Sequence, residues 1–206
     1  MFMIVIYSGF WILYFQMFDT VLWYLKDYVD MTPVNTAVNK VLALFVENPD
    51  WRFDTEHVTV INAGTIILLQ LFISAVLKKT KALPTMIAGI ALGTLGMAVL
   101  AASNHPYVFL LGLFVFSIGE MTVHPKFISY IGLIAPQDKK ALYLGYSFLY
   151  GVIGSGIGGI LGAYLYVYFV DVMHKPSLLW LIFSFIGVLT ILELLLYNKY
   201  LAPKKS

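Results

Sequence analysis

Three ionisable residues lie close together inside one long apolar segment of the sequence. Glu120, His124 and Lys126 fall within "GEMTVHPK", and Pro125 stands between the last two. Glu120 and His124 are four residues apart, so they share one face of a helix. An acid and an imidazole on one face could contact a polar substrate or respond together to protons. Pro125 cannot donate a backbone hydrogen bond, which predicts a bend of the helix beside them.

The composition shows what surrounds these residues. The 206 residues are 60% hydrophobic and 12% charged, whereas soluble domains have about 25% charged residues. This bias predicts a membrane protein, with the lipid bilayer as a partner. A net charge of +2 with scattered bases does not favour nucleic-acid binding. The absence of cysteine excludes disulfides and zinc–thiolate sites.

Six apolar segments are long enough to cross a bilayer, which takes about 20 residues of helix. We therefore expect an all-α membrane protein whose residues 1–206 form a single bundle of six transmembrane helices. The predicted spans cover about residues 3–25, 58–77, 83–102, 107–135, 142–170 and 177–197. The long connection after the first span has Val34, Val38, Val41 and Phe45 at helical spacing. It predicts a short amphipathic helix over about residues 33–46, lying on the outer surface or serving as a lid or partner site.

Basic residues are distributed unequally between the two sets of loops. Those on one side are Lys78, Lys79, Lys81, Lys139, Lys140, Lys199, Lys204 and Lys205, and those on the other are Lys26, Lys40, Arg52 and Lys175. Because the more basic short loops stay in the cytoplasm, both termini are predicted to be cytoplasmic. The expected location is the inner or plasma membrane of the cell.

Small residues recur every four positions in two of the spans. Gly89 and Gly93 form one such pair, and Gly154, Gly158 and Gly162 form a longer row. Faces of this kind let helix backbones approach closely in lipid. They predict helix-packing surfaces, either static or able to slide.

Further polar residues lie at membrane depth, where an ionisable group costs at least about 2.5–3.5 kcal/mol. Gln16 and Asp19 share a face of the first span, and Asn62 lies in the second. With Glu120 they could line one cavity if the first, second and fourth spans meet. Glu120 is the candidate for substrate contact, and His124 has either this role or a structural one.

The charged residues of these spans have alternative roles. Asp19 and Lys126 could form ion pairs or a gate, and Lys126 could instead contact substrate. Glu120 and His124 could supply two ligands to a metal, but a third is not evident. We therefore predict no metal and no cofactor.

Beyond these physical arguments, the sequence resembles a known family. "GEMTVHPKFISYIGLIAP" resembles the tenth helix of the proton-dependent oligopeptide transporters, within the major facilitator superfamily. "FWILYFQM", "VTVINAGTII" and "YLGYSFLYGVIGSGIGGILG" are similar to the seventh, eighth and eleventh helices of that family. The resemblance covers nearly the whole chain in the expected order. It implies that the chain is the C-terminal six-helix half of such a transporter.

The resemblance implies roles for particular residues. Glu120 would hold the amino end of a bound peptide, Asn62 would lie near the substrate, and Asp19 would belong to an external gate. Protons would be the coupling ion, and the substrate a peptide or another small molecule. His124 stands where the family usually has a small polar residue and Lys126 where it has an apolar one, which predicts a different substrate selectivity. The family site lies between two halves, so the missing N-terminal half would be needed for transport.

Two alternatives come from other classes of protein. The chain could be a self-sufficient carrier or channel, in which a second copy covers the polar faces. It could also be an intramembrane serine protease, for which "GSG" at residues 154–156 is the only support. We therefore predict that the chain is not an enzyme.

Overall fold

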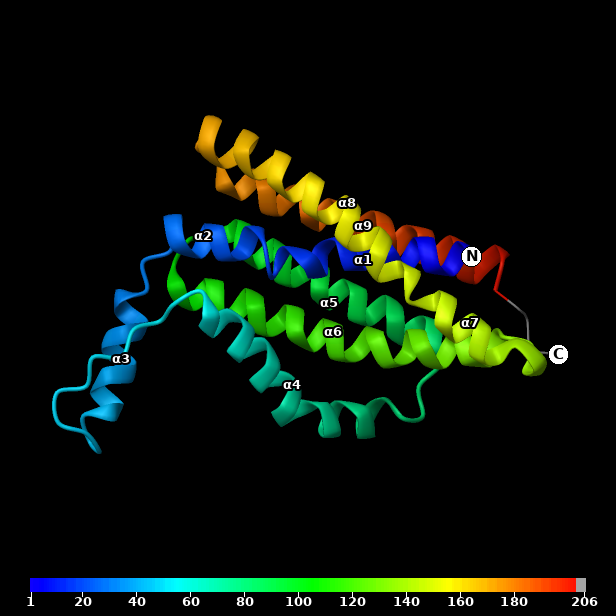
Figure 1. Ribbon diagram of the computed structural model, residues 1–206, viewed down its shortest axis with the longest axis horizontal. Helices are drawn as coiled ribbons and strands as arrows, with labels where there is room; N and C mark the ends of the chain where they lie inside the picture. Colours follow the sequence, from blue (N-terminus) through cyan, green and yellow to red (C-terminus); the bar gives the residue numbers. More distant parts are fainter. Residues whose placement is uncertain (203–206) are drawn as a thin grey trace.

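The fold is a bundle of long helices, as predicted. A computed structural model describes residues 1–202, and over that range the regular secondary structure is entirely helical (Figure 1). Six segments are long and apolar enough to span a membrane: Phe2–Tyr28, Glu56–Leu77, Ala82–Ala102, Pro106–Ile134, Gln137–Val172 and Pro176–Tyr200. Each coincides with one predicted span to within a few residues.

The four uninterrupted helices are easily described. They are α4 (Glu56–Leu77), α5 (Ala82–Ala102), α6 (Pro106–Ile134) and α9 (Pro176–Tyr200). Proline begins α6 and α9, where its fixed φ suits the first turn and its missing N–H costs nothing. The α6 helix remains helical on both sides of Pro125, and the bend predicted there stays a prediction.

The first span is not one continuous helix, contrary to the sequence prediction. It consists of α1 (Phe2–Gln16) and α2 (Thr20–Tyr28), separated by a turn at residues 17–19. Asp19 adopts φ −120° and ψ −93°, which lies outside the helical region. The break places Asp19 at the start of α2, at the point where the backbone leaves the helix.

The fifth span is also interrupted, where one helix over 142–170 was expected. A 3₁₀ turn η1 (Gln137–Lys139) leads into α7 (Lys140–Ser147), followed by α8 (Leu149–Tyr166) and a π-helical turn η2 (Val167–Val172). At the junction, Ser147 Oγ donates to the Leu144 carbonyl, and the Phe148 and Gly151 amides bond three residues back. Local serine bonds of this kind compete with the helical ladder.

The predicted amphipathic helix is present but shorter than expected. It is α3 (Thr32–Leu42), followed by turns over residues 43–48 rather than helix to residue 46. Asn48 has φ +49°, a left-handed conformation that reverses the chain before Pro49. Val34 is buried, whereas Phe45 is 80% exposed, so the C-terminal end of this segment does not pack against the bundle.

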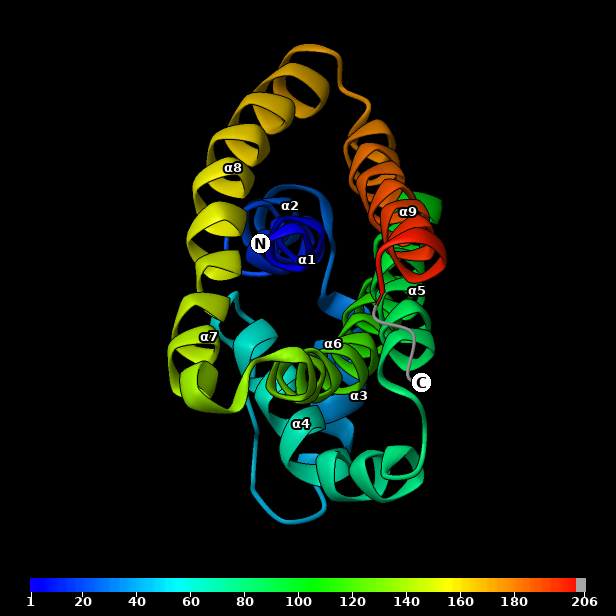
Figure 2. The same ribbon diagram turned by 90° about the vertical axis from the view of Figure 1, so that its right-hand side faces the viewer.

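The six spans divide in chain order into a first group made of α1–α2, α4 and α5 and a second group made of α6, α7–α8 and α9, and helices of each group pack on helices of the other (Figure 2). The first helix of the first group, α1, packs mainly on α8 and α9 from the second group. The first helix of the second group, α6, packs on α4 and α5 from the first group. A contact between α5 and α9 joins the two outer helices. In each group the first helix thus packs on the other group, which fits the three-plus-three repeats within each half of a major-facilitator fold.

The loops are sorted between the two ends of the bundle. The start of α1, the end of α9, the α4–α5 connection and α7 lie at one end, whereas α3 lies at the other (Figure 1). This grouping is the one assumed in the predicted topology, where the lysine-rich loops share a side.

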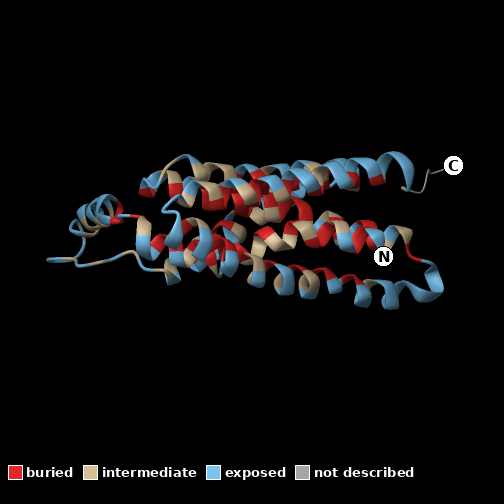
Figure 3. Cartoon of the chain, turned by 90° about the horizontal axis from the view of Figure 1, so that it is seen from above, coloured by how far each residue is buried: buried red, intermediate tan, exposed pale blue. Residues whose placement is uncertain are grey.

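Burial follows the same arrangement (Figure 3). The core contains wholly buried Tyr7, Phe10, Phe116 and Trp180, whereas α4 presents apolar side chains outward, with Leu71 83% exposed. A bilayer requires such a helix, because apolar side chains face the lipid and the backbone hydrogen bonds are satisfied within the helix.

Candidate substrate-binding site

The centre of the candidate site is a hydrogen-bonded group of three side chains from α4 and α6. Asn62 Nδ2 donates to Glu120 Oε2 at 3.1 Å and to Ser117 Oγ at 2.9 Å. Ser117 in turn donates to the Leu113 carbonyl at 3.0 Å, a bond within its own helix. A carboxylate can only accept, so the amide nitrogen of Asn62 faces it. The structure thus brings together Asn62 and Glu120, two of the predicted substrate-binding residues.

The remaining oxygens of this group are available. Among residues 1–202, Asn62 Oδ1 and Glu120 Oε1 have no hydrogen-bond partner, and neither is a fully enclosed atom. Asn62 is 8% exposed and Glu120 is half-buried. Two free acceptors beside each other, one of them charged, suit a ligand with several N–H donors.

His124 lies one turn further along α6 and is held by α1. Its Nδ1 is 3.2 Å from the hydroxyl oxygen of Tyr7, which is wholly buried. The Tyr7 ring stacks on Phe127 with centroids 3.9 Å apart, which fixes the hydroxyl in place. His124 is therefore positioned by a contact between α1 and α6 that the sequence reasoning did not find.

Aromatic side chains from α1 and α8 surround this histidine. Trp11 lies with its ring centroid 5.8 Å from that of His124, and Tyr150 lies at 6.0 Å. Trp11 also packs on Tyr14 at 4.3 Å and on Tyr150 at 4.6 Å. The wall formed by Trp11, Tyr14 and Tyr150 has faces that attract cations. Tyr150 and Ser117 were missed, although Ser117 lies three residues before Glu120 on the same helix face.

Gln16 does not join this group. It is fully buried, and its Nε2 donates to the carbonyls of Ile12 at 2.8 Å and Gly158 at 3.1 Å. Its Oε1 accepts from Thr20 at 3.0 Å. Every polar atom of Gln16 is thus used in attaching α1 to α8 and in bridging the α1–α2 break. The structure gives it a packing role in place of the expected substrate contact.

The two residues predicted to form ion pairs or a gate are not paired with charges within the described part of the chain. There, the single ion pair joins Arg52 and Asp50 on the surface. Lys126 Nζ donates instead to the carbonyls of Leu77 at 2.6 Å and Thr80 at 2.8 Å, the last ones of α4 and its turn. A cation suits that end of a helix because the helix dipole is negative there. Asp19 lies at the α1–α2 break, partly exposed.

Glycine rows bring the helices of the site close together. A Cβ at Gly154 or Gly158 would approach Trp11 and Ile12 on α1 within 3.2 Å. A Cβ on Gly162 would collide with Gln16 Oε1. Gly89 and Gly93 lie in the same way against α6 and α1 respectively. These glycines set the spacing of α8 from α1 and of α5 from α1 and α6. The aromatic wall projects from α1 and α8, and Glu120 projects from α6.

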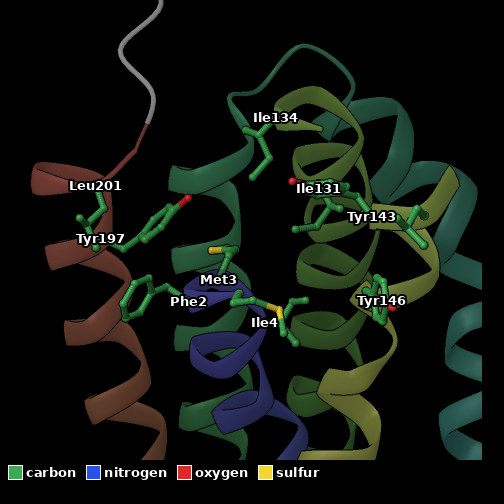
Figure 4. A pocket seen from close by; sticks show the side chains of 11 residues that line it. Phe2, Met3, Ile4, Ile131, Ile134, Tyr143, Tyr146, Tyr197 and Leu201 are labelled. Atoms are coloured by element: carbon green, nitrogen blue, oxygen red, sulfur yellow. The ribbon is translucent and has the colours of Figure 1, made fainter. Parts of the chain in front are cut away.

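A separate cavity lies at the end of the bundle where α1 begins and α9 ends (Figure 4). It has a volume of about 520 Å³ and is lined by apolar and tyrosine side chains of α1, α6, α7 and α9, among them Met3, Ile131, Tyr146 and Tyr197. Glu120 and Asn62 do not line it. They lie on α4 and α6, which pack against each other, while α5 packs on α6 and α9 packs on α5.

Comparison with known proteins gives the family. The sequence profile of the Major Facilitator Superfamily matches residues 51–206. The chain belongs to the Major Facilitator Superfamily. Its fold is that of half a transporter of this superfamily. The protein is therefore a multi-pass membrane protein, and its superfamily consists of transporters.

Individual relatives match a shorter segment. "Solute carrier organic anion transporter family member 4C1" of Homo sapiens is 30% identical over 75 residues, and that of Rattus norvegicus is 31% identical over 75 residues. The match covers 36% of this chain but only 10% of each relative. No solved structure matches the chain significantly. None of these relatives belongs to the oligopeptide transporters that the sequence resembles.

The serine suggested for a protease has a local role. Ser155 Oγ donates to the carbonyl of Val152, one turn earlier in α8. Superfamily membership favours transport over enzymatic chemistry.

Proposed function

We propose that this chain is the C-terminal half of a secondary active transporter that binds amine-bearing small solutes, such as the amino end of a peptide. The observation that carries the proposal is the pair of free acceptors at Asn62 and Glu120. A primary ammonium group has three donors, and this site offers two acceptors and an aromatic wall. Such a group would bind Glu120 Oε1 and Asn62 Oδ1 while lying against Trp11 or Tyr14.

The open side of the site supports a second proposal, about partners. Sites in this superfamily form between two six-helix halves, and here the polar residues come from one side of one bundle. We propose that a further six-helix bundle, either an N-terminal half or a second copy, completes the site. Native mass measurement in mild detergent distinguishes the two, since a homodimer would have twice the mass of the chain.

Protons are the coupling ion that we propose. Glu120 and His124 are four residues apart on α6 and both are half-buried near the free acceptors. Substrate binding to the carboxylate would then compete with, or follow, protonation of this pair. Uptake into liposomes by the completed transporter should accelerate when a proton gradient is imposed, and unchanged uptake would refute the coupling.

The binding proposal is tested with Glu120→Gln, which keeps the shape and removes the charge. A hydrogen bond to a charged group contributes about 1.5–3 kcal/mol, so amine affinity should fall roughly 10- to 150-fold. The matched control is Glu193→Gln, the same change on exposed Glu193 of α9. Equal affinities of the wild type and Glu120→Gln would overturn the proposal.

The named relatives suggest a second candidate, an organic anion as substrate. A carboxylate at Glu120 would repel such a ligand, so the same variant has the opposite expected effect. Benzoate serves as the probe: tighter benzoate binding by Glu120→Gln, without loss of amine binding, would favour the organic-anion alternative.

A further inference from the structure

The surroundings of His124 determine which of its two ring nitrogens carries the hydrogen. The Tyr7 hydroxyl is wholly buried, and its hydrogen needs an acceptor. His124 Nδ1, at 3.2 Å, is the partner that the described residues provide. If Nδ1 carried the hydrogen, Tyr7 would accept and its own hydrogen would lack a partner in the core. The favoured arrangement therefore has Tyr7 donating to an unprotonated Nδ1.

The other nitrogen then carries the hydrogen, because a neutral imidazole has one donor and one acceptor nitrogen. His124 Nε2 has no hydrogen-bond partner among residues 1–202, and it is not an enclosed atom. His124 is half-buried beside Trp11 and Tyr150. A free N–H donor thus lies next to the aromatic wall.

The N–H donor of His124 lies about one turn of α6 away from Glu120. Four residues of helix correspond to a rise of about 6 Å. One end of the site therefore offers acceptors, at Glu120 and Asn62, and the other offers a donor.

We infer that His124 is a specificity-determining residue, which binds a hydrogen-bond acceptor on the substrate. This acceptor, such as a carbonyl oxygen, lies within a few bonds of the ammonium group of the substrate. Tyr7 positions His124 by fixing the tautomer of its ring. The inference rests on the proposed function and narrows its substrate class to amines that carry a carbonyl group. Tyr7 itself does not touch substrate.

The tautomer is tested on the chain alone, reconstituted in lipid nanodiscs. The pH is about 8, which is above the ordinary histidine pKa of roughly 6.5. Nitrogen-15 NMR of labelled histidine distinguishes protonated from unprotonated ring nitrogens, and His124→Asn assigns the signal. We expect hydrogen on Nε2 in the wild type and a mixture of tautomers in Tyr7→Phe. Tyr130→Phe is the control, since the hydroxyl that it removes has Tyr197, at 3.1 Å, as its one hydrogen-bond partner among residues 1–202. Hydrogen on Nδ1 in the wild type would overturn the inference.

The specificity is tested with two amines of the same size, β-alaninamide and 3-methylbutylamine. They differ in that a carboxamide in the first replaces an isopropyl group in the second. His124→Phe keeps an aromatic ring but removes the donor, so it should weaken β-alaninamide binding roughly 3- to 10-fold. Binding of 3-methylbutylamine should not change, and Tyr7→Phe should shift the ratio in the same direction by a smaller factor.

The outcomes separate the two proposals. If both amines bind through Glu120 but the ratio is the same in His124→Phe, the inference about His124 is wrong and the proposed function stands. If neither amine binds to the chain, alone or with a completing bundle, the proposed function fails and the inference fails with it.

Discussion

Gly119 on α6 lies directly against Gly93 on α5. A Cβ at Gly119 would be 2.5 Å from the backbone nitrogen of Gly93 and 2.7 Å from the carbonyl oxygen of Gly89. These neighbours are backbone atoms, which cannot move aside without shifting a helix. The residue before the candidate substrate ligand Glu120 is therefore fixed by direct backbone contact.

Gly119→Ala should separate α5 from α6. Overpacking of a core typically costs about 1–3 kcal/mol, and we expect a lower melting temperature in detergent. The control is Gly156→Ala on α8, where the added Cβ meets nothing within 4 Å. That change should be neutral or stabilise by up to about 1 kcal/mol, because alanine favours helix. A similar melting temperature for both variants would contradict the described contact.

Gln16→Leu tests the attachment of α1 to α8. The change removes the hydrogen bonds to Ile12, Gly158 and Thr20. Leaving buried partners unsatisfied costs about 1–3 kcal/mol, so the melting temperature should fall. The ratio of affinities for β-alaninamide and 3-methylbutylamine should stay the same, since both polar atoms of the Gln16 side chain are already hydrogen-bonded within the bundle. A changed ratio with unchanged stability would restore Gln16 to the substrate site.

The sequence predicted the spans well because length and hydropathy are local properties. It could not predict the two breaks, at residues 17–19 and at Phe148. Neither has a proline, and the break at Phe148 depends on a serine hydroxyl bonding to its own helix. Spacing alone cannot show whether such a serine bonds locally or across helices.

The site could be predicted where a residue type is costly in lipid, and less well elsewhere. Glu120 and Asn62 were predicted because polar groups at membrane depth need a partner or a function. The structure joins them by a hydrogen bond, and their contact with substrate stays a prediction. Tyr7 was missed because a tyrosine in an apolar span looks like ordinary core, and only the fold brings it to His124, 117 positions away in the chain. Gln16 was placed in the site by its helix face, but its contact with Gly158 depends on the α1–α8 packing.

Asp30 gives a prediction about pH. Hydrogen bonds from the side chain and backbone of Thr32 lower the pKa of Asp30, which precedes α3, and the Thr32 N–H lies 3.0 Å from Asp30 Oδ1. Because this pKa is lower in the folded state, the stabilisation that ionised Asp30 gives to the folded state is complete above the ordinary carboxyl pKa of about 3.9. This stabilisation is lost as the pH falls through the lower pKa of the folded state.

The protection of amides at the start of α3, measured against the exchange rate of an unstructured peptide at the same pH, should therefore fall in acid, and Asp30→Asn should reduce this dependence. Asp50→Asn is the control, because Asp50 is bonded to Arg52 and not to Thr32. Identical acid profiles of the wild type and Asp30→Asn would contradict the prediction.

The orientation in the membrane can be tested with single cysteines, because the sequence contains none. Lys79→Cys lies in the α4–α5 connection, and Glu47→Cys lies in the loop after α3. In intact cells an impermeant thiol reagent should label Glu47→Cys but not Lys79→Cys, since the lysine-rich loops are predicted to be cytoplasmic. The reverse pattern would invert the topology.

Lys126→Met tests whether Lys126 stabilises the end of α4. The change removes the charged hydrogen bonds to the carbonyls of Leu77 and Thr80. Bonds of this kind contribute about 1.5–3 kcal/mol, so amide exchange over residues 74–81 should increase and the melting temperature should fall. The matched control is Lys78→Met, because Lys78 lines the same cavity of about 190 Å³ between α4 and α6 without a hydrogen bond among the described residues. If both variants behave alike, the charge of Lys126 acts on its general surroundings and not through those two carbonyls.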